Sequence, residues 1–204
     1  MSKSVYFFNK IKKFKKKIFV DGDKSLSIRW ALLSSLAIGK SRAYNLLKSE
    51  DVLNTLKALK KLGIKVYYNK KFHEIIGNGL NGFEYNNNTI INAGNSGTLG
   101  RLILALLIKS TKKIKLVGDK SLSKRDFSRI IDPLSKIGAS FYPKNKNKLP
   151  LIMEGTNFTR PIKYYESRGS AQCKSSVMLA ALNSPGKTFI KAKKSRDHTE
   201  ILFK

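Results

Sequence analysis

The sequence has little cysteine and histidine and no long apolar run, and each shortage excludes a class of protein. Cys173 is the only cysteine among 204 residues, so no internal disulfide can form, and a reducing compartment is indicated. With only His73 and His198 beside it, no metal-ligand spacing occurs. The longest apolar run, residues 102–108, is too short to span a membrane, and the first residues contain no apolar signal region. We therefore expect a soluble cytoplasmic protein without a metal.

Acidic residues are also scarce. The chain has 13 of them against 41 lysines and arginines, which gives a formal net charge of +28. Such an excess favours a polyanionic partner or a phosphorylated substrate. The lysines are scattered, however, and their abundance beside Asn and Ile is also typical of a compositional bias spread over solvated faces. The exception is the basic run at residues 10–17, which contains Ile11 and Phe14.

A six-residue sequence, Gly-Asp-Lys-Ser-Leu-Ser, occurs twice, at residues 22–27 and 118–123. The first copy opens a helix-like stretch, whereas the second precedes one, so the two copies are not equivalent. A longer repeat of about 73 residues is better evidence of internal duplication. It indicates three copies of one supersecondary unit that buries its core against its neighbours.

Each copy of this unit has two predicted helices. The downstream helix starts at an acidic residue, shows apolar residues at helical spacing and, in the first two copies, ends at a glycine. A strand-like run follows the first two of these helices, at residues 64–68 and 139–141. The predicted downstream helices are residues 51–63, 126–138 and a start at 195–202; the upstream helices are 25–38, 97–108 and 170–182, followed by β-like runs at 43–47, 114–117 and 188–190. Residues 78–88 and 144–148 indicate loops.

Small and polar residues precede the three upstream helices, whose N-termini would present free N–H groups and positive dipole ends. Together with nearby cations these ends could bind phosphate or carboxylate. The plainer alternatives are helix caps at Ser25 and Ser170 and a surface ion pair between Arg125 and Asp126. A buried apolar role is favoured for Cys173. For His198 at a helix start, a cap or surface position is favoured over a general base.

Five ordered motifs resemble the 5-enolpyruvylshikimate-3-phosphate synthase family. They cover nearly the whole chain, from residue 18 to 202, and the Lys24-Ser25 pair separates it from the related UDP-N-acetylglucosamine enolpyruvyl transferases, which have Lys-Asn there. The motifs are Gly-Asp-Lys-Ser-Leu-Ser-Ile-Arg at 22–29, Gly-Asn-Ser-Gly-Thr at 94–98 with Arg101, Gly-Asp-Lys-Ser-Leu-Ser-Lys-Arg at 118–125, Ser-Ala-Gln-Cys-Lys-Ser at 170–175 and Ser-Arg-Asp-His-Thr-Glu at 195–200.

The resemblance implies an α/β (α+β) fold with βαβαββ units around a pseudo-threefold axis, the inside-out barrel of enolpyruvyl transferases. Two domains of three units would face each other across a cleft. Residues 21–204 would form one domain, nearly complete, with its third unit truncated. Residues 1–20, with Ile18, Phe19 and Val20 as a strand, would belong to the second, mostly absent domain.

The resemblance also implies the reaction. The enolpyruvyl group of phosphoenolpyruvate moves onto the 5-hydroxyl of shikimate 3-phosphate, and phosphate is released through a tetrahedral intermediate on the way to chorismate and aromatic amino acids. No cofactor, nucleic acid or membrane takes part, and the full-length protein would be a monomer. Lys24 would be catalytic and contact both substrates; Ser25, Arg29, Ser170, Ala171, Gln172 and Arg196 would bind shikimate 3-phosphate; Gly97, Arg125 and Gln172 would bind phosphoenolpyruvate.

Two departures from the family pattern matter. Arg125 is followed by Asp126-Phe127 where Pro-Met is usual, so a negative charge adjoins a cation meant for an anion unless Asp126 caps its helix and points away. The family has six units, whereas this chain has two and part of a third. We therefore expect an N-terminal portion that is inactive alone. The alternative is a basic nucleic-acid-binding repeat protein, although neither stacking aromatic platforms nor a basic recognition helix is evident.

Overall fold

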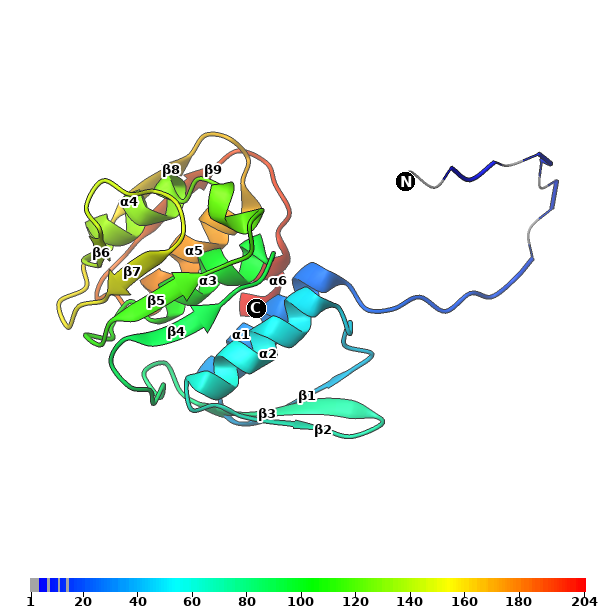
Figure 1. The fold of residues 1–204 in the computed structure, drawn as a ribbon, viewed down its shortest axis with the longest axis horizontal. Coiled ribbons are helices and arrows are strands. Elements are labelled where there is room, and N and C mark those ends of the chain that lie inside the picture. The colour runs from blue at the N-terminus through cyan, green and yellow to red at the C-terminus, as the bar shows by residue number, and fades with distance from the viewer. Residues whose placement is uncertain (1–3, 7, 11, 14) are drawn as a thin grey trace.

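The computed structural model of the chain describes residues 4–6, 8–10, 12–13 and 15–204. The residues up to 20 that it describes extend away from the folded body (Figure 1). In the body the elements follow in the order α1 (Lys24–Leu36), β1 (Ile38–Tyr44), α2 (Glu50–Lys61), β2 (Lys65–Tyr68), β3 (Phe72–Asn78), β4 (Thr89–Asn92), α3 (Gly97–Leu106), β5 (Ile114–Val117), the 3-10 turn η1 (Leu122–Lys124), α4 (Ser128–Ile137), β6 (Ser140–Tyr142), β7 (Leu151–Glu154), β8 (Lys163–Glu166), α5 (Ala171–Ala181), β9 (Phe189–Ala192) and α6 (His198–Phe203).

The middle of the chain contains one whole repeat unit. From β4 to β7 the elements run β-α-β-α-β-β, which is the unit that the family resemblance implies. The first copy begins at α1, and the third consists of β8, α5, β9 and α6 among the described residues. Each copy has its own sheet, with strand orders β1-β3-β2, β4-β5-β7-β6 and β8-β9.

Strand pairing confirms that the copies share one architecture. β4 runs parallel to β5, and β8 runs parallel to β9. The parallel connections pass through α3 and α5, because parallel strands need a crossover. β5 pairs antiparallel with β7, as β1 does with β3. In Figure 1, α1 and α2 lie over the β1-β3-β2 sheet.

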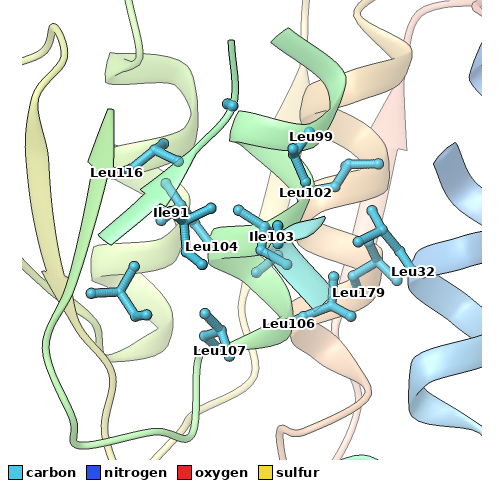
Figure 2. Packing of buried hydrophobic residues seen from close by; sticks show 14 of the residues in the cluster. Leu32, Ile91, Leu99, Leu102, Ile103, Leu104, Leu106, Leu107, Leu116 and Leu179 are labelled. Atoms are coloured by element: carbon cyan, nitrogen blue, oxygen red, sulfur yellow. The ribbon is translucent and has the colours of Figure 1, made fainter. Parts of the chain in front are cut away.

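Helix α3 lies at the centre of the core. Nine of its ten residues are buried, all except Arg101, so it is apolar on nearly every side, as expected of a helix enclosed by other elements. Figure 2 shows Leu102, Ile103 and Leu106 of α3 near Leu32 of α1 and Leu179 of α5. This packing holds the N-terminal ends of the three upstream helices in one rigid arrangement. Among the described residues, no helix is both long and apolar enough to cross a membrane.

All six predicted helices are present. Their bounds agree with the sequence within a few residues, and the largest shift at a helix start is in α6, which begins at His198 rather than at residue 195. Gly63 and Gly138, predicted to stop α2 and α4, have φ angles of +83° and +133°. Glycine adopts these values at little cost, which explains its position at both helix ends.

The strands were predicted less well. The β-like run at residues 43–47 was wrong, because β1 begins at Ile38 and ends at Tyr44. Its central residues include Gly39, Ser41 and Arg42, and backbone bonding to β3 rather than an apolar pattern defines it. The periodicity also did not reveal four strands that the unit requires, β3, β4, β7 and β8.

The expected strand at residues 18–20 is wrong for this structure. Ile18, Phe19 and Val20 are exposed by 68%, 87% and 74%, and no backbone ladder joins them to another described segment. A strand needs a hydrogen-bonded neighbour, and here only the side-chain amide of Asn45 donates to the Val20 carbonyl, at 3.2 Å. Residues 1–3, 7, 11 and 14 of the proposed second-domain segment lie outside the described residues, so the division at residue 20 stays a prediction.

Candidate anion-binding site

The three upstream helices start with the same capping device. In each, a side-chain oxygen of the N-cap residue accepts a hydrogen bond from the N–H three positions later, which leaves the other first-turn N–H groups available to a ligand. Ser25 is therefore not the cap of α1, whereas Ser170 is the cap of α5, as its plainer interpretation suggested. The bonds join Asp23 to Leu26 at 2.8 Å, Ser96 to Leu99 at 3.2 Å and Ser170 to Cys173 at 3.3 Å.

The repeated hexapeptide forms the same local structure in both places. Asp23 accepts from the Leu26 N–H, and Asp119 accepts from the Leu122 N–H at 2.7 Å. The first copy continues into α1, whereas the second forms only the turn η1 before Arg125. The two loops thus have the same local structure, but the first opens the upstream helix of its unit and the second precedes the downstream helix of the next unit.

Arg29 joins three helices at the base of the site. It is only 4% exposed, and its guanidinium donates to Thr199 Oγ1 at 2.9 Å, to Ser175 Oγ at 3.3 Å and to the Ser25 carbonyl at 3.2 Å. Burial and then the like charge of Arg196 lower the pKa of Arg29. The network fixes α1, α5 and the first turn of α6 to one another.

Two exposed cations lie at the start of α1. The Lys24 ammonium pairs with the Asp51 carboxylate at 3.0 Å. The Arg196 guanidinium reaches the Ser25 hydroxyl at 3.4 Å, although the two residues are 171 positions apart. The fold therefore brings the first and last motifs of the chain together at one helix N-terminus.

Gln172 connects α5 to α3. Its side-chain N–H donates to Thr98 Oγ1 at 3.0 Å, and its oxygen accepts from Arg101 Nη1 at 3.1 Å. The same Arg101 nitrogen donates to the Gly97 carbonyl, and the guanidinium lies 4.9 Å from the centre of the Phe127 ring. Burial lowers the pKa of Arg101. These bonds hold a cation directly over the N-terminus of α3.

Arg125 and Asp126 do not form the ion pair that their adjacency suggested. Arg125 donates to Asn95 Oδ1 at 2.8 Å, whereas the Asp126 carboxylate accepts from the N–H and the hydroxyl of Ser128, both at 2.8 Å. The backbone hydrogen bond from Ser128 is the main cause of the lowered pKa of Asp126. The carboxylate thus caps the start of α4 and leaves Arg125 over α3.

A buried carboxylate shapes the loop before α5. Glu166 is 2% exposed, forms an ion pair with Arg129 and accepts from the N–H groups of Ser170 and Arg168 at 2.6 Å and 3.3 Å. Burial acts to raise the pKa of Glu166, but these two N–H groups and the guanidinium outweigh it, so the pKa is lowered. Glu166 therefore positions the capping serine of α5.

The structure arranges the predicted residues in two adjoining groups. One lies over α3 and contains Gly97, Arg125 and Gln172. The other lies between α1, α5 and α6 and contains Ser25, Arg29 and Arg196. Lys24 adjoins the second group on the first turn of α1, Ser170 caps α5, and Ala171 is its first residue.

Several residues of the site were not among the predicted ones. Arg101 was noted only as the end of a motif, and Asp51 only as a helix start. Arg101, Ser175 and Thr199 all belong to the five motifs, so the motif pattern could have indicated them as site residues, because motif residues gather at the site. The motifs do not indicate that Ser175 and Thr199 bond to Arg29.

Cys173 and His198, the two side chains considered as possible reactive groups, lie in different environments. Cys173 is a free, buried thiol, 2% exposed, on the inner side of α5, which confirms its apolar packing role. His198 is the first residue of α6 and half-buried, and its Nδ1 has no hydrogen-bond partner among the described residues. Within the part of the chain that the structure describes, no cluster of three His, Cys, Asp or Glu side chains suits a metal ion.

Comparison with known proteins agrees with this geometry. Residues 8–204 match the family model described as EPSP synthase (3-phosphoshikimate 1-carboxyvinyltransferase), and the chain belongs to this family. A 3-phosphoshikimate 1-carboxyvinyltransferase of Ruthia magnifica is 44% identical over 186 residues, which are 91% of this chain and 42% of that protein. One of Novosphingobium aromaticivorans is 40% identical, over 93% of this chain and 43% of its own length.

A solved structure shows the same fold. EPSP synthase from Acinetobacter baumannii superposes with a TM-score of 0.85 at 35% sequence identity, over 92% of this chain and 42% of that one. The predicted fold class is thereby confirmed, and nothing in these matches supports the nucleic-acid-binding alternative. The chain spans about two fifths of the length of the relatives that it matches.

Proposed function

We propose that this chain supplies one domain of an enzyme that transfers the enolpyruvyl group of phosphoenolpyruvate to the 5-hydroxyl of shikimate 3-phosphate. The observation that carries the proposal is the position of Gln172, which ties the first turn of α5 to the N-terminal part of α3 through Thr98 and Arg101 and so holds two anion-binding helix ends side by side. Two polyanionic substrates that react with each other need two adjoining anion sites. Membership of the EPSP synthase family supports the same reaction.

The two groups differ in the anion that each suits. Between α1, α5 and α6, the Ser170 cap, the hydroxyl of Ser25 and the cation of Arg196 fit a sugar-like phosphate with hydroxyl groups. We assign Ala171 and Arg29 to this group by motif, with Arg29 holding the helices together. Over α3, the open N-terminus and Arg125 fit the compact phosphoenolpyruvate.

The reaction needs proton transfer as well as charge stabilisation. The 5-hydroxyl adds to C2 of phosphoenolpyruvate while C3 gains a proton, and loss of phosphate with a C3 proton then restores the double bond. Lys24, on the first turn of α1, is the proposed proton-transferring residue of this domain. Its ion pair with Asp51 holds the ammonium group at the start of the helix.

We further propose that residues 21–204 form one domain and that residues 1–20 belong to the second one. All helices and strands of the described residues lie after residue 20. A monomeric cytoplasmic enzyme remains our expectation for the whole protein.

Binding of shikimate 3-phosphate to residues 1–204, measured by titration calorimetry, tests the proposal. We expect Arg196→Ala to weaken binding about tenfold or more, because a hydrogen bond to a charged group contributes about 1.5–3 kcal/mol. Arg42→Ala is the matched control, since Arg42 is an exposed arginine on β1 that pairs with Glu74. Equal affinity of the two variants would contradict the assignment.

The same preparation separates the proposal from the rejected alternative. RNA binding that is tight at low salt and stronger than binding of shikimate 3-phosphate would favour the hypothesis of a nucleic-acid-binding protein. Residues 1–204 alone are expected to release no phosphate when both substrates are supplied. Clear phosphate release would contradict the expectation that this portion is inactive by itself.

Gly97→Ala is expected to weaken phosphoenolpyruvate binding about three- to tenfold with little change in stability. A Cβ at this position would lie 2.6 Å from Arg101 Nη1 and 3.1 Å from Arg125 Nη1. Both are ends of flexible side chains, so they move and the cations leave their places over α3. Gly100→Ala, one turn later, is the control, because its Cβ would meet only the Phe127 ring and Ala93 at 3.5 Å or more. Titration calorimetry of both variants compares the affinities.

A further inference from the structure

A cavity lies between α2 and β2, and its lining includes none of the residues of the two anion-binding groups. Its volume is about 360 Å³, which falls in the range of small-molecule sites. Figure 1 shows α2 lying over the β1-β3-β2 sheet. The cavity is lined by Lys48, Leu53, Leu56, Lys57, Lys60, Val66, Tyr67, Tyr68 and His73.

The floor of this cavity is apolar and aromatic. Leu56 is buried, Val66 is half-buried, and Leu53 is 42% exposed although it lies on the apolar face of α2. The rings of Tyr68 and His73 stand 4.5 Å apart at 34°. Burial, with a smaller effect of Lys48, lowers the pKa of His73, which favours the neutral imidazole beside the Tyr68 ring.

The rim of the cavity is cationic. Lys48, Lys57 and Lys60 line it, and no carboxylate is among its lining residues. Lys48 donates to the Tyr68 hydroxyl at 3.0 Å, which holds its charge at the aromatic wall. A neighbouring cavity of about 290 Å³ shares Lys48, Tyr68 and His73; Lys70 and Lys71 line it too, together with Asp21.

We propose that the cavity between α2 and β2 binds a small aromatic carboxylate, with its ring on the Leu56–Val66 floor and its charge at the lysine rim. The apolar floor selects a ring, because burying it removes apolar surface from water. The cationic rim selects an anion over a neutral analogue. This cavity shares no lining residue with the anion-binding groups at α1, α3 and α5. The proposal therefore does not depend on the proposed enolpyruvyl transfer.

Histidine NMR tests this site directly, because the chain has only His73 and His198. Titration of ¹³C-histidine-labelled chain with 2-naphthoate is expected to shift the His73 ring signals in a saturable way and to leave His198 unchanged. The neutral 2-naphthalenemethanol is expected to bind at least threefold more weakly. No shift of His73 at millimolar 2-naphthoate, or equal shifts of both histidines, would overturn the proposal.

Charge-reversal variants give a second readout. Lys57→Glu with Lys60→Glu is expected to weaken 2-naphthoate binding at least fivefold, because both lysines lie on the rim. Lys187→Glu with Lys191→Glu changes two exposed lysines near β9 by the same amount of charge and is the control. Leu53→Trp, which fills the cavity without removing a charge, is expected to abolish the His73 shift. If the control weakens binding as much as the rim variant, general charge attraction explains binding and the site is refuted.

Discussion

Phe127→Ala is expected to lower the free energy of unfolding by about 3–5 kcal/mol, the range for a fully buried phenylalanine. Phe127 is 0% exposed, and its N–H donates to the Asn147 carbonyl at 2.7 Å. Its ring supports the Arg101 guanidinium and adjoins Gly100 of α3. The substitution opens a cavity where α4 starts and removes the surface on which a site cation rests.

Denaturant unfolding of the variant measures this effect, and Phe158→Ala is its control. Phe158 is 88% exposed, so its loss is expected to change stability by less than about 0.5 kcal/mol. A cost below about 1 kcal/mol for Phe127→Ala would mean that the ring does not pack as described. Phe127 is also a departure from the family motif, and its burial shows that an aromatic residue is accommodated there as part of the core.

Glu166→Gln is expected to lower the free energy of unfolding by about 2–3 kcal/mol, because hydrogen bonds to a charged group are lost in a buried place. The amide cannot accept from Arg129 and from the Ser170 N–H as the carboxylate does. The cap of α5 then loosens, and shikimate 3-phosphate binding is expected to weaken with it. Glu154→Gln, a half-buried glutamate on β7, is the control.

The pH dependence of stability distinguishes the charge of Glu166 from its shape. The pKa of Glu166 is lowered in the folded chain from an ordinary value of about 4.3. Its contribution is therefore present above about pH 4.3 and is lost as the pH falls through the folded pKa. We expect the stability difference between the native chain and Glu166→Gln to be full at pH 7 and to shrink below pH 4. A difference that is constant down to pH 3 would contradict this account.

The helices were predictable because their signals are local. The Leu-rich face of α2 and the stop at Gly63 lie within one short segment, and the same holds for α4 and Gly138. The strands were predicted only in part. The runs at residues 114–117 and 188–190 correspond to β5 and β9, whereas the equally short β4 and β8 were missed, because a strand of four residues is defined by its neighbour. β1 shows this most clearly, since its residues alternate between exposed and half-buried and only the ladder to β3 makes them a strand.

In the candidate site too, local sequence signals were predictable and contacts between distant segments were not. Motif residues such as Gly97, Arg125 and Gln172 could be assigned by resemblance, and the structure places them together over α3. The bonds of Arg29 could not be predicted, because Thr199 and Ser175 lie 170 and 146 residues away and their motifs do not say which distant side chain they contact.

The helices and the repeat can be predicted from the sequence alone, because apolar spacing and a Gly at a helix end act over a few residues. The caps could be predicted only in part, since Ser170 caps α5 but Asp23 rather than Ser25 caps α1. The sequence also determined the family, through five motifs in order. Which atoms meet depends on the tertiary structure. The Asp126 carboxylate accepts from Ser128 rather than pairing with Arg125, and Arg196 reaches Ser25. Such contacts depend on how α1 and α5 pack against the buried helix α3 and α6 against α1, and distant side chains gain their neighbours only when that core has formed.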